Sequence, residues 1–510
     1  MLSVVSLAAT TLAGFFLMPF LVHRLGDRMY GYWALVGAVL GYYGVLDLGI
    51  SPAVSFQIAK AVGEGDSDSP NRTLSTAVVA FAVLGLIALA VTVIVAACCP
   101  LFIASASDVR LFRAVLVIVG IGFAFGLPGR AFMGGVYAHL RNDLVAAVGI
   151  LTVILRTSLI VAVIALGWGI VGLAAVSLLT DAATYLASYL ILRKIQQGLR
   201  ISPALADKKT FKELFEYGRY SMVTRMGDQL RFAVDGWMVA AFVGIGAVAH
   251  YTIASRLSGY FLSLVLSAVA LLQSWFSQML GNRDYDGIRK VLAVGTRFAA
   301  ALSTIVACSF IFYGRAFIAT WMGATYVDAY WPSLILVMAV FCDLAQQPSV
   351  TYLFGVSRHR YLAVQTLAEG VANLLLSVYW GHRYGMIGVA MGTLVPMFIA
   401  KIVLQPAYVC RSAGLPLARY YIRDFGGGVA APALCSFGLW ALLLRRVELP
   451  NIAMVCMVVA LQALACAMMA SYFVLGSEDR RRVLGKLWFR RGLAKESGAP
   501  ASVNLGLREP

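Results

Sequence analysis

Apolar segments of membrane-spanning length fill most of this chain, and they limit its fold more than any other feature. A helix of about 20 apolar residues crosses the hydrocarbon core of a bilayer. Such segments must be helical, because an unpaired backbone amide in hydrocarbon costs several kcal/mol. Hydropathy predicts fourteen of them in the 510 residues. They are 3–22, 31–59, 75–97, 113–137, 143–166, 170–192, 216–242, 247–279, 289–314, 331–355, 361–380, 385–410, 425–444 and 452–475.

The first 66 residues are echoed 218 positions further along the chain without a gap. The matching pairs are Gly26 and Gly244, Gly41 and Gly259, Tyr42 and Tyr260, Gly63 and Gly281, and Asp66 and Asp284. A repeat of this length predicts two structurally similar halves. Two halves in a membrane are typical of a transporter whose substrate lies between them.

We therefore expect an all-α membrane protein with two pseudo-symmetric six-helix lobes and two further C-terminal helices. The expected divisions are an N-lobe at 1–192, a cytoplasmic amphipathic linker at 193–215, a C-lobe at 216–410, helices thirteen and fourteen within 411–475, and a basic cytoplasmic tail at 476–510. The linker carries Phe211, Leu214 and Phe215 among lysines, which is typical of a short helix on the membrane surface.

Composition excludes a soluble protein, since 61% of the residues are hydrophobic and only 13% are charged. The formal net charge of +17 does not indicate nucleic-acid binding. Most Lys and Arg residues lie in the short loops and the tail on one side of the predicted spans. This asymmetry follows the positive-inside rule and puts both termini in the cytoplasm.

Charged side chains inside the spans are candidates for function, because each costs at least about 2.5–3.5 kcal/mol at the membrane centre. The densest set is in the seventh span: Arg225, Asp228, Arg231 and Asp235. On an ideal helix the last three lie within about 60° of one another. We expect them to face partner charges or a wet cavity between the halves. The scattered candidates are Asp47, Arg130, Arg156, Asp181, Arg256, Arg297, Asp343, Glu369 and Lys401. Their signs nearly balance, so ion pairs that hold the bundle together are the alternative.

A substrate-binding role is predicted for the arginines, because the guanidinium fork suits phosphate oxygens. The predicted set is Arg225, Arg231, Arg256, Arg130 and Arg156. An ion-coupling role, for H⁺ or Na⁺, is predicted for Asp228, Asp235 and Asp47. We expect no catalytic residues, no metal and no cofactor, because the five histidines lack ligand spacing and no hydrolase or Walker motif is present.

Three short motifs resemble those of a known family. Residues 25–35 read LGDRMYGYWAL, residues 46–50 read LDLGI, and residues 63–66 read GEGD. Together they resemble the polysaccharide transporter branch (Wzx-like, O-antigen flippases) of the MOP superfamily, which also holds the MATE exporters and the lipid II flippases. In the second half Asp235 and the following Val243-Gly244 fit the pattern loosely. Gly236 stands where the family usually has a basic residue.

The resemblance implies a flippase that moves undecaprenyl-diphosphate-linked oligosaccharide, an O-antigen or exopolysaccharide repeat unit, across the bacterial inner membrane. Two six-helix lobes would form a V-shaped cavity that opens alternately to each side. The implied partners are the lipid-linked glycan, membrane lipids and the polysaccharide polymerase or export machinery. We expect no nucleic-acid partner and a functional monomer, since one chain holds both lobes.

Two other functions stay open. A MATE-like exporter of small organic cations, driven by H⁺ or Na⁺, predicts an acidic, aromatic cavity with few arginines. A membrane polymerase or glycosyltransferase predicts a sizeable outward loop with catalytic residues. The outward stretches near 98–112 and 315–330 are short and nearly uncharged, which argues against such an enzyme.

Overall fold

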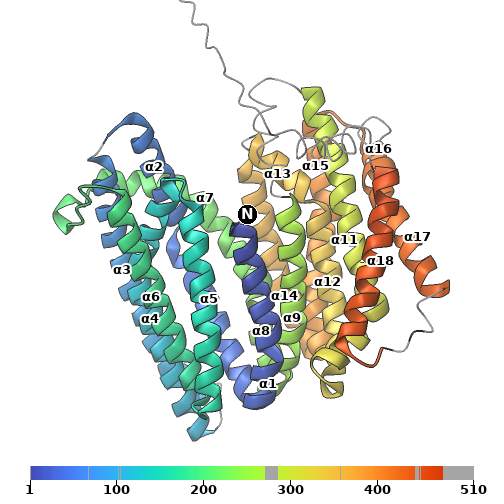
Figure 1. Cartoon of the computed structure of the whole chain (residues 1–510), viewed down its shortest axis with the longest axis horizontal. Helices are drawn as coiled ribbons and strands as arrows, with labels where there is room; N and C mark the ends of the chain where they lie inside the picture. The colour runs from blue at the N-terminus through green and yellow to red at the C-terminus, as the bar shows by residue number, and fades with distance from the viewer. Residues whose placement is uncertain are drawn as a thin grey trace, which may run out of the picture.

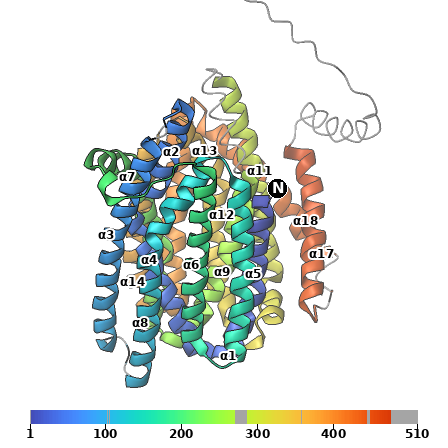
Figure 2. The same ribbon diagram turned by 60° about the vertical axis from the view of Figure 1, so that its left-hand side comes forward.

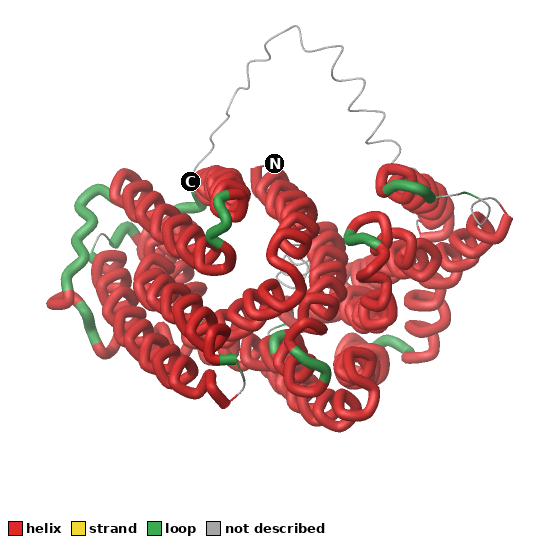
Figure 3. The backbone as a smooth tube through the Cα atoms, turned by 90° about the horizontal axis from the view of Figure 1, so that it is seen from below, coloured by secondary structure: helices red, strands yellow, loops and turns green. Residues whose placement is uncertain are grey.

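The computed structural model describes residues 2–474 except 67, 102, 104, 270–284, 357, 443–446 and 448. The predicted tail and the repeat positions Gly281 and Asp284 lie outside the described residues. Every regular element within them is a helix, which confirms the all-α class. Figures 1 and 3 show these helices standing side by side in two groups. One group comes from the N-terminal part of the chain and the other from the C-terminal part.

The N-terminal group holds the first six helices and occupies the left and centre of Figure 1. They are α1 (Leu2–Tyr43), α2 (Ile50–Glu64), α3 (Ser69–Cys98), α4 (Ala106–Ala138), α5 (Asn142–Ala165) and α6 (Gly169–Ile195). Helix α4 packs against both α3 and α6, and α5 packs against α6 and α1.

The C-terminal group begins at α7, which Figure 1 labels beside α2, and most of the group occupies the right of that figure. Its helices are α7 (Lys208–Phe232), α8 (Val234–Phe242), α9 (Ile245–Val269), α11 (Tyr285–Trp321), α12 (Tyr330–Ala345), α13 (Gln347–Gly355), α14 (His359–Met397), α15 (Gln405–Ala413) and the short α16 (Leu417–Arg419). Two more helices, α17 (Gly426–Leu442) and α18 (Ile452–Val474), pack against α11 at the outer edge, as Figure 2 shows.

Ten helical stretches of the described residues are long and apolar enough to cross a membrane, so the chain is a multi-pass membrane protein. Two of them, Val5–Asp47 and Arg360–Ala413, have 43 and 54 residues and exceed a single crossing. Each contains a glycine outside helical geometry, Gly26 in the first and Gly385 in the second. The predicted seventh and eighth spans are not among the ten. Helix α7 carries many charges, and the eighth span runs into residues outside the described part.

The two groups meet along α1, which packs against α9. A core of buried side chains is shared between them, with Val22 and Val36 from α1 and Val248 and Ile253 from α9. Met322, which follows α11, belongs to the same core and is fully buried. Apolar contact thus joins the groups on one side of the molecule.

Helix α7 extends from one group to the other. It begins at Lys208, within the predicted linker, where the Asp207 side chain accepts a hydrogen bond from the Thr210 amide at 3.1 Å. The backbone amides of Thr210 and Lys209 hold the pKa of Asp207 below its usual value. Leu214 is fully buried in the core of the N-terminal group, whereas α7 also packs along α14. The predicted surface helix and the predicted seventh span are therefore one helix.

The break between α1 and α2 coincides with the LDLGI motif. Leu48 and Gly49 have positive φ angles of 51° and 72°, which end the 3₁₀ turn η1 (Gly44–Asp47) and redirect the chain into α2. At this corner the backbone of α7 passes at Gly218, so close that a Cβ atom at Gly218 would lie 2.6 Å from the Gly49 carbonyl oxygen. Only glycine fits both positions without moving the backbone.

Gly218→Ala is expected to lower the amount of folded protein, because its methyl group would push two backbones apart. Overpacking of this kind costs about 1–3 kcal/mol. Gly236→Ala in α8 is the matched control, since a Cβ there meets no atom within 4 Å. The measurement is the thermal midpoint of both variants in detergent. Equal midpoints for the two variants would show that the close approach is not as described.

Candidate functional site

A cavity of about 310 Å³ lies between the two groups where α1, α5 and α9 come together. Arg156 of α5 and Arg256 of α9 both line it. Its walls also include the aromatic side chains of Tyr30 and Trp33 from α1 and Tyr260 from α9. Aromatic walls with a few convergent polar groups are typical of a ligand site. Two of the five predicted substrate-binding arginines are therefore brought together, from opposite groups.

The two arginines differ in how many of their N–H donors already have partners within the protein. Arg256 is exposed, and no carboxylate lies within ion-pair distance of it in the described part of the chain. Arg156 donates from Nε to the Thr180 hydroxyl at 2.9 Å and forms an ion pair with Asp181 of α6. Its side chain is nevertheless 37% exposed. Arg256 thus has its whole guanidinium available to an anion, and Arg156 has part of it.

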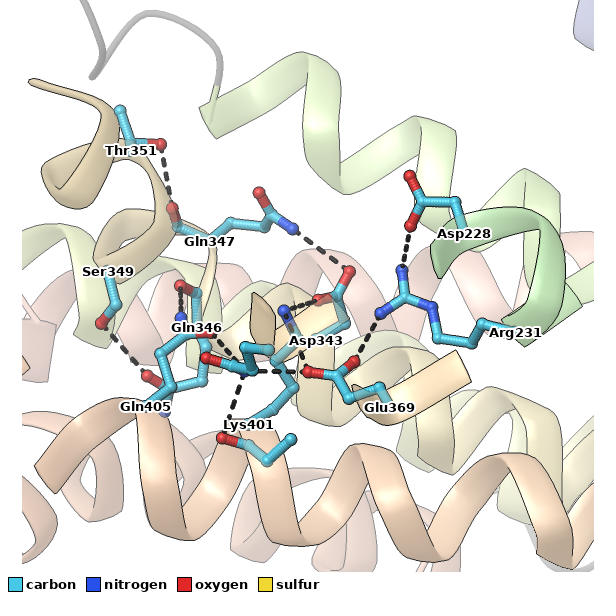
Figure 4. Close-up of polar contacts among 12 residues, drawn as sticks. Asp228, Arg231, Asp343, Gln346, Gln347, Ser349, Thr351, Glu369, Lys401 and Gln405 are labelled. Atoms are coloured by element: carbon cyan, nitrogen blue, oxygen red, sulfur yellow. Dashed lines mark hydrogen bonds and ion pairs between the residues drawn. The ribbon is translucent and has the colours of Figure 1, made fainter. Parts of the chain in front are cut away.

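Arg231 does not line this cavity. Its guanidinium instead forms ion pairs inside the C-terminal group. Figure 4 shows its guanidinium between two carboxylates, Asp228 one turn earlier on α7 and Glu369 of α14. The distances are 3.0 Å from Nη2 to Asp228 and 2.8 Å from Nη1 to Glu369. Glu369 is almost completely buried, whereas the Asp228 side chain is 43% exposed. Partner charges, rather than a wet cavity, therefore account for Arg231.

The same network continues to a buried lysine. The Lys401 ammonium lies 3.0 Å from Asp343 of α12 and 3.8 Å from Glu369, and all three side chains are buried. The cluster thus holds two cations, Arg231 and Lys401, against three carboxylates. Opposite charges at this depth stabilise one another only while the set is complete.

The inward position of Lys401 follows from a local change of helix geometry. Residues Phe398–Leu404 form a π-helical turn, η5, directly before α15. Pro406 has no N–H, so the carbonyl of Ile402 loses its ordinary helical partner. The Tyr421 hydroxyl donates a hydrogen bond to that carbonyl instead. A wider turn at this point is a known way to re-aim a side chain within a helix.

Neutral polar side chains extend the network beyond the charges. Gln365 donates to Glu369 at 2.8 Å and to Gln405 at 3.1 Å, and Gln405 donates to the Gln346 carbonyl at 3.2 Å. The Tyr420 hydroxyl donates to the Gln346 side chain at 2.6 Å. Sequence reasoning overlooked these residues because it considered only charges. Glutamines at membrane depth are a usable signal, since an amide there needs partners.

Asp235 is separate from the charged cluster, although it follows Arg231 by one turn. The chain is interrupted at Ala233, so Asp235 belongs to α8. Its Oδ2 accepts hydrogen bonds from the Tyr251 hydroxyl at 2.6 Å and the Thr393 hydroxyl at 2.9 Å. Its Oδ1 is buried without a partner, and no cation is paired with this carboxylate among the described residues. Asp235 is thus an enclosed carboxyl group that accepts hydrogen bonds from two hydroxyls.

Asp47 and Arg130 form a pair within the N-terminal group. Asp47 accepts hydrogen bonds from the Ser51 amide at 3.0 Å and the Ser51 hydroxyl at 2.6 Å, which caps the start of α2. Arg130 lies 3.4 Å from the same carboxylate and 5.0 Å above the Phe123 ring. Neither residue lines the cavity of Arg156 and Arg256, and the substrate-binding role of Arg130 stays a prediction.

Arg225 is exposed on α7. It has no ion-pair partner in the described residues, and it does not line the cavity. Its substrate-binding role stays a prediction. The same holds for the ion-coupling roles of Asp228 and Asp47.

Comparison with known proteins places the chain in a family. Residues 1–280, more than half of the chain, match the model of the family described as "Polysaccharide biosynthesis protein". The chain belongs to the polysaccharide biosynthesis protein family. This confirms the resemblance that the N-terminal motifs indicated.

A curated relative and two solved structures extend the comparison of this polysaccharide biosynthesis protein. The putative O-antigen transporter of Shigella flexneri is 20% identical over 417 residues, which cover 77% of this chain and 92% of the relative. The lipid II flippase MurJ in an inward closed conformation has a TM-score of 0.74 at 15% identity, covering 92% of this chain and 98% of MurJ. An inward-facing MATE family multidrug transporter has a TM-score of 0.68 at 16% identity, covering 81% and 98%. The last two show that this chain shares the fold of MurJ and of the MATE transporter.

Proposed function

We propose that this protein is a flippase for a lipid-linked oligosaccharide of the undecaprenyl-diphosphate type in the bacterial inner membrane. The observation that carries the proposal is the pair of arginines, Arg156 and Arg256, that face one cavity from opposite groups. Membership of the polysaccharide biosynthesis family and similarity to a putative O-antigen transporter support it. Transport of this kind makes and breaks no covalent bond, so the protein would not be an enzyme.

The chemistry of the cavity suits such a substrate. A diphosphate carries several oxygens that a planar guanidinium can bind through two parallel N–H donors. Tyr30, Trp33 and Tyr260 offer aromatic faces with polar edges, against which a sugar ring packs. The prenyl tail would remain in the surrounding lipid. One substrate would thereby contact both groups at once, as alternating access requires.

The proposed topology has fourteen crossings, with both termini in the cytoplasm. The non-helical glycines Gly26 and Gly385 divide α1 and α14 into two arms each, which supports four crossings from these two elements. The excess of Lys and Arg in alternate loops supports the orientation. Two pseudo-symmetric six-helix lobes, followed by α17 and α18, would then form one functional monomer. Contact with the polymerase or export machinery is a further prediction.

We also propose that Asp235 carries a coupling proton. It is enclosed, lacks a cationic partner and keeps one oxygen without a hydrogen bond, and a protonated carboxyl group would suit this setting. Asp47 and Asp228 are both paired with arginine, which favours Asp235 among the three predicted carboxylates.

Asp235→Asn is expected to leave the fold intact and to abolish the dependence of transport on a pH gradient. The amide matches the carboxylate in shape and still accepts the hydroxyl hydrogen bonds, but it cannot exchange a proton. Initial transport rates in proteoliposomes, with and without an imposed gradient, measure the effect. Asp143→Asn is the control, because Asp143 is exposed and paired with Arg141. A gradient response that persists in Asp235→Asn would contradict the assignment.

Membranes of a deletion strain test the function in cells. The account predicts that undecaprenyl-diphosphate-linked oligosaccharide accumulates with its sugars inaccessible from the periplasm, and that surface polysaccharide falls. Unchanged lipid-linked glycan together with increased sensitivity to cationic dyes would instead favour the MATE-like exporter.

A further inference from the structure

A polar cluster joins the two groups at the end of the molecule where α1 makes its turn, the lower end in Figure 1. His250 of α9 stands between two carboxylates. Its Nδ1 lies 2.7 Å from Asp328 of the 3₁₀ segment η4 (Ala324–Ala329), and its Nε2 lies 3.6 Å from Asp27 of α1. The Tyr326 hydroxyl also donates to Asp27, at 2.7 Å. Asp27 belongs to the N-terminal group and the other three residues to the C-terminal group.

A second polar contact between the groups joins α1 to the end of α11. The Trp321 indole N–H donates to the Phe15 carbonyl at 3.1 Å, and the two rings stack 4.8 Å apart. Phe15 is on α1, and Trp321 ends α11 just before η4. The cluster at His250 and the Phe15–Trp321 contact therefore both join the two groups on this side of the interface.

The geometry at His250 suits the protonated ring. A neutral imidazole donates one hydrogen bond, whereas an imidazolium donates two. Both ring nitrogens here face an acceptor that carries a negative charge, and the acceptors lie on different elements. The titratable groups in contact with the ring are Asp27 from α1 and Tyr326 and Asp328 from η4, and His23 of α1 packs against Tyr326. Arg28, next to Asp27 in the chain, is paired with Asp108.

Water reaches the cluster. The side chains of Asp27 and Asp328 are 39% and 52% exposed, and that of His250 is 15% exposed. Histidine changes its charge between about pH 5 and 8. Without the proton, two carboxylates from opposite groups face a neutral ring that satisfies only one of them.

We propose that His250 is a proton-operated clasp that holds the two groups together at this end of the molecule. When protonated it joins Asp27 to Asp328 across the interface, and when neutral it leaves Asp27 to the hydrogen bond from Tyr326. Acidic pH therefore favours the joined state of the two groups at this end, and alkaline pH favours their separation. If this end faces the periplasm, as the proposed topology has it, an acidic exterior returns the emptied transporter to its inward-open state. That last step rests on the proposed function; the clasp itself does not.

The test is a distance measurement on the purified full-length protein, which needs no transport. Nitroxide labels at Leu166→Cys and Tyr384→Cys, both exposed, report the separation of the groups once the eight native cysteines are replaced. Between about pH 5.5 and pH 8, the ratio of separated to joined populations should rise at least about fivefold, the lower limit of typical coupling. His250→Gln should remove this pH response, and His250→Lys should hold the joined population at both pH values.

Two controls keep the outcome unambiguous. His139→Gln changes a histidine that bonds only to the Gly135 carbonyl, and the pH response should survive it. Asp27→Asn, which keeps an acceptor for Tyr326, should weaken the response if His250→Gln folds poorly. A wild-type distribution that does not change with pH, or a response that persists in both His250→Gln and Asp27→Asn, would overturn the clasp. Normal glycan flipping is compatible with either result, so failure here is distinguishable from failure of the proposed function.

Discussion

Glu369→Ala is expected to remove most of the folded protein from the membrane. Its carboxylate lies between Arg231 and Lys401, and all three are buried. Truncating one member of a buried ion network leaves uncompensated charge, which costs about 3–5 kcal/mol. Whole proteins are stable by only about 5–15 kcal/mol. The measurement is the monodisperse fraction in detergent after expression at matched transcript level.

A double substitution separates this explanation from a general intolerance of change at Glu369. Arg231→Met with Glu369→Leu removes one cation and one carboxylate together and leaves Lys401 paired with Asp343. Replacing a buried pair by apolar residues is often neutral, so the double variant should recover much of the folded protein. Glu216→Ala, which breaks an exposed pair with Lys212, should have little effect. A double variant as unstable as Glu369→Ala would contradict the ion-pair account.

Arg256→Ala is expected to abolish flipping while the protein accumulates normally. The side chain is exposed in the cavity and has no ion-pair partner among the described residues, so its loss leaves no buried charge behind. Hydrogen bonds to charged groups contribute about 1.5–3 kcal/mol, which corresponds to about 10- to 100-fold in substrate affinity. Arg256→Lys should retain part of the activity, because it keeps the charge and loses the fork.

The control for Arg256 is Arg110→Ala, which removes an exposed arginine of α4 that does not line the cavity. Both variants are compared in the same flipping assay at equal protein amounts. Arg256→Ala with the activity of Arg110→Ala would remove the cavity from the proposed substrate site.

The sequence predicted the all-α, multi-pass architecture, because a bilayer requires long apolar helices and ten such stretches are present in the described residues. The count of fourteen spans stays a prediction. It also predicted that the charges of the seventh span face partner charges or a wet cavity, and Arg231 lies between two carboxylates. It could not predict which partners, since Glu369 lies 138 positions away and meets Arg231 only through tertiary packing. The prediction that Asp235 shares a face with Arg231 assumed a continuous helix, and the interruption at Ala233 separates their surroundings.

Which residues line the cavity also could not be predicted from the sequence. Five arginines were predicted to bind substrate. The sequence could not rank them, because it indicates only that each lies at membrane depth and not whether a carboxylate pairs with it. Tertiary packing pairs Arg130 with Asp47 and Arg231 with Glu369, whereas Arg256 lines a cavity and has no ion-pair partner in the described part of the chain. The inward turn of Lys401 depends on Pro406 and Tyr421 together, which no local pattern reveals.

The most direct test of the central claim is reconstitution of the purified protein in liposomes that contain undecaprenyl-diphosphate-linked oligosaccharide. A glycosidase added outside cleaves only glycans in the outer leaflet. The account predicts that wild-type protein makes nearly all of the glycan cleavable, and that Arg256→Ala vesicles behave like protein-free vesicles. Wild-type vesicles that retain a protected inner-leaflet pool equal to that of protein-free vesicles would contradict it.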